Sequence, residues 1–571
     1  MLRLSLVAAV LAAVFAVPAH GQPTVLMPGV TYDRQLVLSR FGPEVVHVVT
    51  APRPGGLYTV APVLSNGTVL GKETLTSMQK RLATTGTMVG VDGDTSSADG
   101  VPSGVLVQSG VLAATTNVKR SSIGFDASGT MRVERVGLNA TWQGNGQRRA
   151  VVVNRRPGAQ GSTLYTPAWG TTTPSEAGSV EAVLPALGAV VPGGVHTAAV
   201  TELRSGGLTP IPAGGGVLVA RGPTAQRLAA EAPVGTPVTF RLVMNPDWST
   251  IVNGLAGGPL LVRNGKAIFN AHEDFSAAVL AGRTARAAVG QKPDGTVVLV
   301  VVDGGLPGFS VGMTNFELAQ TLAKQGVTTA AALESGNAAA LAFDGKLLSR
   351  PAAAEQPVSE MLAVTYAGVY ALPLVSAQLS PNGDGVDETQ TFKYRVARPS
   401  TVSVSLVDPT GATRPIEPAQ ARAPGTYTDV WTGLKPDSTV DVQGTWRWVV
   451  TAKDDLGRDS TAERPFGLNT TLGALRITPA TVAVTPTGGS LTVGFTLAAP
   501  ASWTVVIQSK AGATLRTYTG RSAQPGPVSV RWDGRSKAGA RAYSGAYVAK
   551  VTATNDLGAT GLTASFAVVR R

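Results

Sequence analysis

The sequence lacks cysteine altogether and has only four histidines and 5% aromatic residues in its 571 residues. The absence of cysteine excludes disulfides, thiolate-bound zinc, iron–sulfur clusters and thiol catalysis. So few histidines also make a His-rich metal site or a histidine charge relay hard to build. What is abundant indicates the fold: glycine, proline, valine and threonine favour strands and turns. The 43% apolar fraction is enough for packed cores.

The N-terminus has the pattern of an export signal. Arg3 gives a positive start, Leu4–Val17 is an almost unbroken apolar run, and residues 18–21 include small side chains. The run is shorter than the roughly 20 residues that a spanning helix needs. We therefore expect residues 1–21 to be a signal peptide and the protein to be secreted, extracellular and wall-associated, with no membrane span.

Positive charge concentrates near the C-terminus. Residues 501–571 hold ten lysines and arginines against Asp533 and Asp556, which gives +8 of the formal net charge of +12. Such a field favours an anionic wall polymer or a phosphate-bearing glycan as partner. A solvated basic surface that keeps the protein soluble is the alternative. No nucleic-acid motif accompanies the charge, so we expect no nucleic-acid partner.

Residues 22–372 mix strands with a few short helices. Helical spacing of apolar residues predicts helices over Thr74–Thr85, Thr224–Ala232 and Thr314–Gln325, the last capped by Thr314 with Glu317 three residues on. The continuous apolar run Val297–Val302 predicts a strand buried on both faces.

The remainder of the chain is an internal repeat. Residues offset by 101 positions match between two segments, and about 100 residues is the length of an immunoglobulin-type sandwich. The matching pairs are Trp431 and Trp532, Gly433 and Gly534, Gly444 and Gly545, Trp446 and Tyr547, and Gly457 and Gly558. We therefore predict an α+β chain: a β-rich mixed catalytic-type domain over residues 22–372, then two all-β Ig-like sandwiches over residues 373–470 and 471–571.

Four polar residues of the first domain stand out. Asp303 directly follows the predicted buried strand, which places an acid at the strand's mouth. Asp92 and Asp94 flank Gly93, and on a strand they would project to one face, where neighbouring carboxylates suit acid–base work or a hard cation. Arg286 lies among small apolar residues, and a partly buried guanidinium needs an anion such as phosphate. For each there is a structural alternative: a loop cap, an exposed turn or a salt bridge.

Two glycine-rich segments are candidate binding loops. Gly308-Phe309-Ser310-Val311-Gly312 matches a serine nucleophile elbow, but the strand before it ends too early and no histidine follows it. We interpret this segment as a loop that approaches a ligand. Residues 254–259 form a second loop, whose amides are candidates for contacting phosphate or sugar. In the first predicted sandwich, Asn382, Asp384 and Asp387 have a spacing that suits a structural calcium ion, with a simple turn as the alternative.

Taken together, strings between residues 90 and 362 resemble the phosphodiester glycosidase family (N-acetylglucosamine-1-phosphodiester alpha-N-acetylglucosaminidase-like). The strings that carry the resemblance are Gly90-Val91-Asp92-Gly93-Asp94, Leu164-Tyr165-Thr166-Pro167, Gly257-Gly258-Pro259, Arg286 with Val289-Gly290, Val302-Asp303-Gly304, Pro307-Gly308, Ser310-Val311-Gly312-Met313-Thr314, Asp344-Gly345-Lys346 and Pro357-Val358-Ser359. The last 100 residues similarly resemble the Ig-like module of flagellar hook-capping proteins.

The chain departs from the phosphodiester glycosidase pattern at several places expected to line the site. The family's Asn-Leu-Asp-Gly-Gly-Gly-Ser-Ser-Thr string is replaced by residues 332–340, in which the acid is Glu334 and the hydroxyl run is alanine. Two phenylalanines after Asp94 have become Thr95 and Ser96. An arginine and an asparagine around Pro-Val-Ser have become Gln356 and Glu360.

The resemblance implies an exported glycosidase that hydrolyses a sugar-1-phosphodiester, with no cofactor required and calcium as an option. The expected catalytic carboxylates are Asp92, Asp94, Asp303 and Glu334, with acid and base roles left open. Arg286 is expected to hold the phosphate, and the substrate-binding residues are expected to be Asn337, Gly257, Gly258 and Ser310. The first alternative is a catalytically degenerate glycan- or wall-binding protein of the same fold, and the second is a structural surface protein. The oligomeric state stays open.

Overall fold

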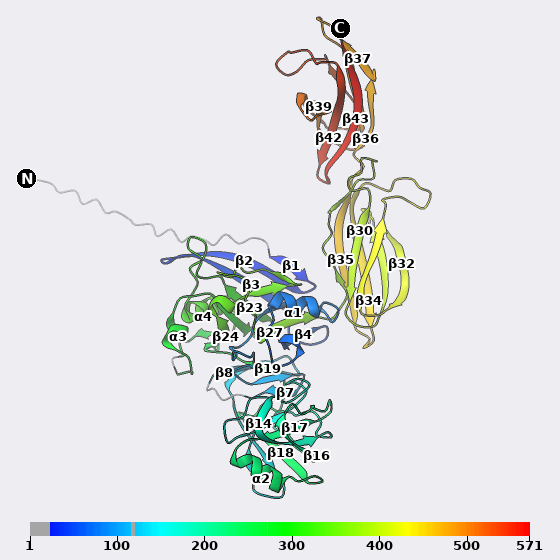
Figure 1. Ribbon diagram of the computed structural model, residues 1–571. Helices are drawn as coiled ribbons and strands as arrows, with labels where there is room; N and C mark the ends of the chain where they lie inside the picture. Colours follow the sequence, from blue (N-terminus) through cyan, green and yellow to red (C-terminus); the bar gives the residue numbers. More distant parts are fainter. Residues whose placement is uncertain (1–22, 116–119, 271) are drawn as a thin grey trace, which may run out of the picture. The chain divides into compact units, whose positions relative to one another are not determined.

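The computed structural model describes residues 23–115, 120–270 and 272–571, and the chain divides into two compact units that meet between Ala367 and Gly368 (Figure 1). The expected signal peptide lies outside the described residues. Within the described part of the chain, no helix is both long and apolar enough to span a bilayer. The predicted α+β class is confirmed, with strands dominating a mixed first unit and all-β Ig-like domains following.

Two antiparallel sheets of the first unit position the candidate site. The larger has the strand order β1 (Thr24–Met27), β2 (Val30–Ser39), β3 (Gly42–Ala51), β23 (Val297–Val302), β22 (Arg286–Gln291), β24 (Thr329–Ser335), β20 (Leu260–Arg263), β21 (Lys266–Ala267). The smaller has the order β26 (Lys346–Leu347), β25 (Leu341–Phe343), β5 (Thr87–Asp92), β27 (Glu360–Tyr366), β4 (Tyr58–Leu64). Every residue of β23 is buried, which confirms the prediction for this strand.

The three predicted helices are present as α1 (Leu75–Arg81), α2 (Pro223–Glu231) and α4 (Asn315–Lys324). Thr314 and Glu317 form a complete capping box at the start of α4. Leu318 and Leu322 of α4 pack with valines of β3 and β23 in one core. The five-residue helix α3 (Ala277–Ala281) was not expected, and short 3₁₀ turns lie at η1 (Ser65–Gly67) and η2 (Gly336–Ala338).

The first unit also contains an insertion, and the hydrophobic core inside it continues onto the sheet that leads into it. A five-stranded sheet leads into it, in the order β7 (Val111–Ala114), β6 (Leu106–Gln108), β19 (Ile251–Ala256), β8 (Ser121–Asp126), β9 (Met131–Arg135). Two further sheets lie within residues 137–245: β11 (Arg149–Ala150), β10 (Gly137–Gln143), β18 (Pro237–Asn245), β15 (Val195–Ala199); and β12 (Val152–Val153), β13 (Ser162–Tyr165), β17 (Gly216–Ala220), β14 (Ser175–Leu184), β16 (Glu202–Gly207).

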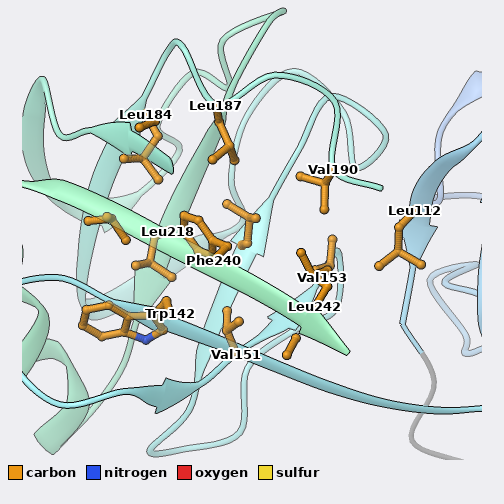
Figure 2. Close-up of a cluster of buried hydrophobic side chains, with 14 of the residues drawn as sticks. Leu112, Trp142, Val151, Val153, Leu184, Leu187, Val190, Leu218, Phe240 and Leu242 are labelled. Carbon is orange, nitrogen blue, oxygen red and sulfur yellow. The ribbon is translucent and has the colours of Figure 1, made fainter. Parts of the chain in front are cut away.

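Figure 2 shows Trp142 and Phe240 among aliphatic side chains of this insertion, including Leu218. Gly137 and Asn245 are paired across β10 and β18, so the insertion leaves and re-enters the rest of the unit at one place. This insertion was not predicted from the sequence, because strand patterns alone do not show which strands share a core.

The second unit contains two sandwiches with the same topology. The first pairs the sheet β28 (Tyr370–Ala371), β30 (Gln390–Val396), β33 (Gly425–Trp431) with the sheet β29 (Gln378–Leu379), β35 (Asp459–Leu468), β34 (Gly444–Asp454), β31 (Ser400–Val407), β32 (Thr413–Arg422). The second pairs β36 (Leu472–Thr478), β38 (Leu491–Leu497), β41 (Gly526–Trp532) with β37 (Thr481–Val484), β43 (Gly558–Arg570), β42 (Gly545–Asn555), β39 (Ala501–Ser509), β40 (Thr514–Ser522).

The 101-residue offset holds at the level of single hydrogen bonds. The indole of Trp431 donates to the carbonyl of Leu434, and the indole of Trp532 donates to the carbonyl of Arg535. These tryptophans end equivalent strands and close equivalent turns. The repeat read from the sequence is therefore a repeat of structure.

Candidate active site

A cavity of about 380 Å³ in the first unit brings together several residues that the sequence singled out. Asp94 enters it just after β5, Arg286 at the start of β22 and Glu334 near the end of β24. Its other lining residues are Thr95, Arg120, Gly257, Gly258, Asp274, Phe275, Ser276, Val279, Leu333 and Ser335. Asp92, Asp303, Ser310 and Asn337 are not among the lining residues.

Gly93 ties three strands together at the mouth of β5. Its amide donates to the carbonyl of Glu360 at 3.0 Å, and its carbonyl accepts from the amide of Glu334 at 2.9 Å. A Cβ on Gly93 would come within 2.9 Å of the carbonyl oxygen of Glu360, so a larger residue would disturb this junction. The amide of Asp94 donates to Oε1 of Glu360 at 2.8 Å. The Asp-Gly-Asp string thus fixes Asp94 and Glu334 relative to one another.

Four acids gather around this junction, and burial perturbs all of them. Burial raises the pKa of Asp94 to about 6, although the Arg120 guanidinium opposes the shift. Burial, and then the charge of Asp94, raises the pKa of Glu334 to about 7 and that of Glu360 to about 8. Burial and the charge of Glu334 also raise the pKa of Asp92 well above its ordinary value. Carboxyl groups with separated pKa values suit acid–base chemistry near neutral pH.

Asp92 lies behind the cavity rather than in its wall. Its Oδ1 accepts from the amide of Ala340 at 3.1 Å, while its Oδ2 is buried without a hydrogen-bond partner. The protonated form that its raised pKa favours explains how such an oxygen tolerates burial. Of the two aspartates that the sequence analysis singled out, only Asp94 lines the cavity.

Arg120 was missed by the sequence analysis and lies directly in the cavity wall. Its Nη1 donates to Oγ1 of Thr95 at 2.7 Å and lies 3.6 Å from Oδ1 of Asp94. The guanidinium also covers the ring of Phe275 at 4.3 Å. The available signal was a cation immediately before the buried strand that begins at Ser121, which by itself is too common to mark a site.

Arg286 is the most unusual group in the cavity. Its side chain is nearly fully buried, at 1% relative exposure for the residue. Nε donates to the carbonyl of Met313 at 3.1 Å, Nη1 donates to that of Val279 at 3.0 Å, and Nη2 donates to that of Gly282. Within the described residues no carboxylate forms an ion pair with it, and burial lowers its pKa to about 10. A buried cation with carbonyl acceptors and no carboxylate partner has the charge and the geometry that suit an anion in the adjoining cavity.

Gly257 and Gly258 line the cavity, but their amides are already used. The amide of Gly257 donates to the carbonyl of Ser121, and that of Gly258 donates to the carbonyl of Ala332. A Cβ on Gly257 would lie 2.7 Å from the carbonyl oxygen of Ala332. Close packing between strands explains why these two positions are glycine. Their amides have no free N–H to donate to a phosphate, contrary to the expectation from the sequence.

Asp303 and Ser310 belong to a separate buried network. Oδ2 of Asp303 lies 3.0 Å from Nε2 of His47, whose Nδ1 lies 2.8 Å from the hydroxyl of Tyr32. Oδ1 of Asp303 accepts from the amide of Arg350 at 2.8 Å. Ser310 accepts from the amide of Val45 and donates to the carbonyl of Asp303. The acid at the strand's mouth therefore holds loops together, away from the cavity lining.

The stretch that departs from the family pattern also sits differently from expectation. Asn337 is exposed on η2, and Ala339 and Ala340 are buried, the latter in the core beside α1. Only the start of the stretch, through Ser335, reaches the cavity. Replacement of the hydroxyl run by alanine thus leaves the wall itself intact. Glu360, noted only as a departure in the sequence, is the buried partner of the Asp94 amide.

The candidate calcium loop is held by its own turns and by contacts with β43 of the second sandwich. The amide nitrogen of the Asn382 side chain donates to Oγ1 of Thr560 at 2.8 Å, and its Oδ1 accepts from the amide of Asp384. Oδ1 of Asp384 accepts from the amide of Val386. Across the part of the chain that the structure describes, no group of three His, Cys, Asp or Glu side chains is arranged to hold a metal ion.

Comparison with known proteins confirms both resemblances. The sequence model of the phosphodiester glycosidase family matches residues 187–365, and that of the FlgD Ig-like domain matches residues 480–556. The first match includes Arg286, Glu334 and Glu360 but begins after Asp94. No curated protein matches the sequence.

Among solved structures, a hypothetical protein from Synechocystis shares the fold, with a TM-score of 0.51 and 23% identity over 61% of this chain. The chain spans 64% of the length of that protein. A protein from Burkholderia pseudomallei K96243 is 23% identical, with a TM-score of 0.46 over 57% of this chain and 74% of its own. The zebrafish N-acetylglucosamine-1-phosphodiester alpha-N-acetylglucosaminidase catalytic domain, auto-inhibited by its pro-peptide, is 13% identical, with a TM-score of 0.33 over 60% of this chain and 84% of its own.

Proposed function

We propose that the cavity of the first unit hydrolyses a sugar-1-phosphodiester to a free sugar and a phosphate monoester. The observation that carries the proposal is Arg286, a buried guanidinium in the cavity wall with carbonyl acceptors and no carboxylate partner among the described residues. A phosphodiester carries a single negative charge and can serve as the anionic partner that Arg286 lacks among the described residues. Two of its oxygens match the paired N–H groups of a guanidinium. The family match over residues 187–365 supports this class of reaction.

The reaction breaks the bond between the anomeric carbon and the phosphate oxygen. A water oxygen forms the new bond to the carbon, and the electron pair of the old bond leaves on the phosphate. Negative charge develops on the leaving oxygen as the bond breaks, and Arg286 stabilises it more strongly than it stabilises the diester until a proton from the cavity neutralises that oxygen.

The acids of the cavity divide the proton transfers. At neutral pH Asp94, with its pKa of about 6, is mostly ionised and takes the proton of the attacking water. Glu334, with its pKa of about 7, is still partly protonated and donates to the leaving oxygen. Arg120 holds Asp94 in the wall. These roles follow general acid–base chemistry between two carboxyl groups of different pKa.

The test uses hexose and N-acetylhexosamine 1-(methyl phosphate) diesters in water enriched with ¹⁸O. Release of sugar and methyl phosphate is expected, with the label in the sugar, because the carbon–oxygen bond breaks. Label in the phosphate would mean attack at phosphorus and would refute a glycosidase mechanism.

The role of Arg286 is tested with Arg286→Met, which keeps the apolar stem of the side chain and removes its charged guanidinium group. The variant should lose about 10²- to 10³-fold in kcat/KM, as expected when an oxyanion-stabilising donor is removed. Arg263→Met is the matched control, since Arg263 is exposed on β20 outside the cavity. Equal losses in the two variants would refute the assignment. Diester binding without turnover in the unaltered protein would instead favour a binding protein of the same fold.

A further inference from the structure

The second sandwich differs from the first in its balance of charge. Residues 471–571 hold eleven lysines and arginines against two aspartates, whereas residues 373–470 hold ten against twelve acids. All ion pairs that the structure records in Gly368–Arg571 lie in the first sandwich. Within residues 471–571, all of which the structure describes, no lysine or arginine side chain is recorded in an ion pair with an aspartate or glutamate.

The register of the repeat shows how this difference arises. Asp437 and Asp441 lie in the connection between β33 and β34, and the residues 101 positions later are Ala538 and Ala542. In the first sandwich Asp441 forms an ion pair with Arg414. The same backbone connection has thus lost its acids in the second sandwich.

The C-terminus lies at one end of the second sandwich (Figure 1), and several lysines and arginines belong to segments that meet at this end. The backbones of Arg535 and Arg541 form an isolated antiparallel β-bridge across the connection between β41 and β42. The equivalent β-bridge of the first sandwich joins Leu434 and Val440. Nη1 of Arg541 donates to the carbonyl of Arg571 at 3.1 Å, which brings the last residue to the same place. The other cations of this end are Lys510, Arg516, Lys537 and Arg570.

Two more groups complete this basic end. Asp533 is its acid, and Oδ1 of that residue accepts from the amide of Arg535. Tyr543 is 73% exposed, and the guanidinium of Arg570 lies 5.0 Å from its ring centroid. An exposed aromatic ring beside cations offers a stacking face to a sugar ring and charge to a phosphate at once.

We propose that the basic end of the second sandwich, separately from the cavity, binds a linear polymer of sugar or polyol phosphates. Cations spread along a connection and a strand end match charges that repeat along a chain. An anionic bilayer is the poorer match, because the exposed large apolar residues of this sandwich are Tyr543 and Val569 alone, and insertion would call for more apolar surface. Binding should weaken with salt, since the cations are exposed.

The test compares two triple variants of the full chain that each remove three positive charges. The end variant is K510Q/K537Q/R570Q, and the control variant, away from this end, is R476Q/R521Q/K550Q. None of the six side chains makes a hydrogen bond that the structure records, so both variants should fold. Long-chain inorganic polyphosphate is the probe, with neutral dextran and phosphatidylglycerol vesicles as comparisons, each titrated at low and physiological salt.

The end variant should bind polyphosphate more weakly, by about tenfold or more, at low salt, since each cation removed gives up a phosphate contact and the counterions that this contact releases. The control variant should lose much less. Equal losses, no binding by the unaltered protein, or a preference for vesicles over polyphosphate would each overturn the proposal. Arg286→Met should bind polyphosphate as the unaltered protein does. Polyphosphate binding therefore tests the basic end independently of the function proposed for the cavity.

Discussion

Replacing Glu360 by glutamine should stabilise the first unit, and more so as the pH rises. Glu360 is fully buried on β27, at 0% exposure. Its Oε1 accepts from the amide of Asp94, and its Oε2 accepts from the hydroxyl of Ser359. Glutamine keeps the first hydrogen bond and reverses the second, with Ser359 as acceptor. The substitution therefore changes the charge of the site and hardly changes its packing.

The magnitude follows from the raised pKa of Glu360. Unfolded, the group ionises near its ordinary value of 4.5, whereas burial and the charge of Asp94 raise its pKa to about 8 in the folded protein. Between these values the folded state holds a proton that the unfolded state has lost, so the stability contributed by the protonated group falls as pH rises through this window. Glutamine has no such loss. The variant should match the unaltered protein near pH 4, gain about 3 kcal/mol at pH 7 and approach roughly 5 kcal/mol above pH 8.

Urea denaturation at several pH values measures this difference. Hydrogen exchange of peptides covering β5 and β27 supplies a readout that belongs to the first unit alone. Glu202→Gln is the control, because Glu202 is exposed and paired with Arg204 on the surface, so its loss should change stability by less than about 1 kcal/mol. A gain from Glu360→Gln that stays constant from pH 4 to pH 9 would refute the reasoning, since a packing effect has no pH dependence.

Three further predictions concern other residues. Glu334→Gln should lower kcat by about 10²- to 10⁴-fold on a sugar-1-phosphodiester. It should also remove the alkaline limb of the pH–rate profile near pH 7, where the unaltered protein loses the Glu334 proton. An unchanged alkaline limb in the residual activity would exclude Glu334 as the acid. Asp303→Asn should lower the thermal stability of the first unit by weakening the contact with His47. KM for the diester should stay within about twofold, because Asp303 lies outside the cavity lining. A selective loss of substrate binding at unchanged stability would contradict this. Thr314→Ala should cost about 1 kcal/mol in urea denaturation through loss of the α4 capping box, and Thr321→Ser, at a helical position with no capping role, is its control.

The sequence predicted features that depend on local patterns. The run of β-branched residues in Val297–Val302 could only be a buried strand, and the 101-residue repeat could only be two copies of one fold. Asp94 and Arg286 were singled out from their local sequence patterns, and Glu334 from its place in the string that resembles the family pattern; all three line the cavity.

Features that depend on long-range pairing could not be read this way. Asp303 looked catalytic because it follows a buried strand, yet the partner that explains it, His47, is distant in sequence and meets it only when β3 pairs with β23. Arg120 has no motif around it and becomes part of the site through Thr95 and Phe275. The hydrophobic core of the insertion could not be predicted from the sequence either, because strand composition does not show which strands pack into one core.

The pairing of Gly137 with Asn245 has a consequence for how the first unit folds. Strands β8 and β19 are neighbours in one sheet but are separated along the chain by the whole insertion. If the insertion folds first, its ends are already adjacent, and the loop that must close between β8 and β19 shortens to residues 127–136 and 246–250. The chain entropy saved is about 2 kcal/mol from the ratio of loop lengths, which would speed the later pairing by roughly twentyfold. The insertion then acts as a folding nucleus for the sheet beside the cavity.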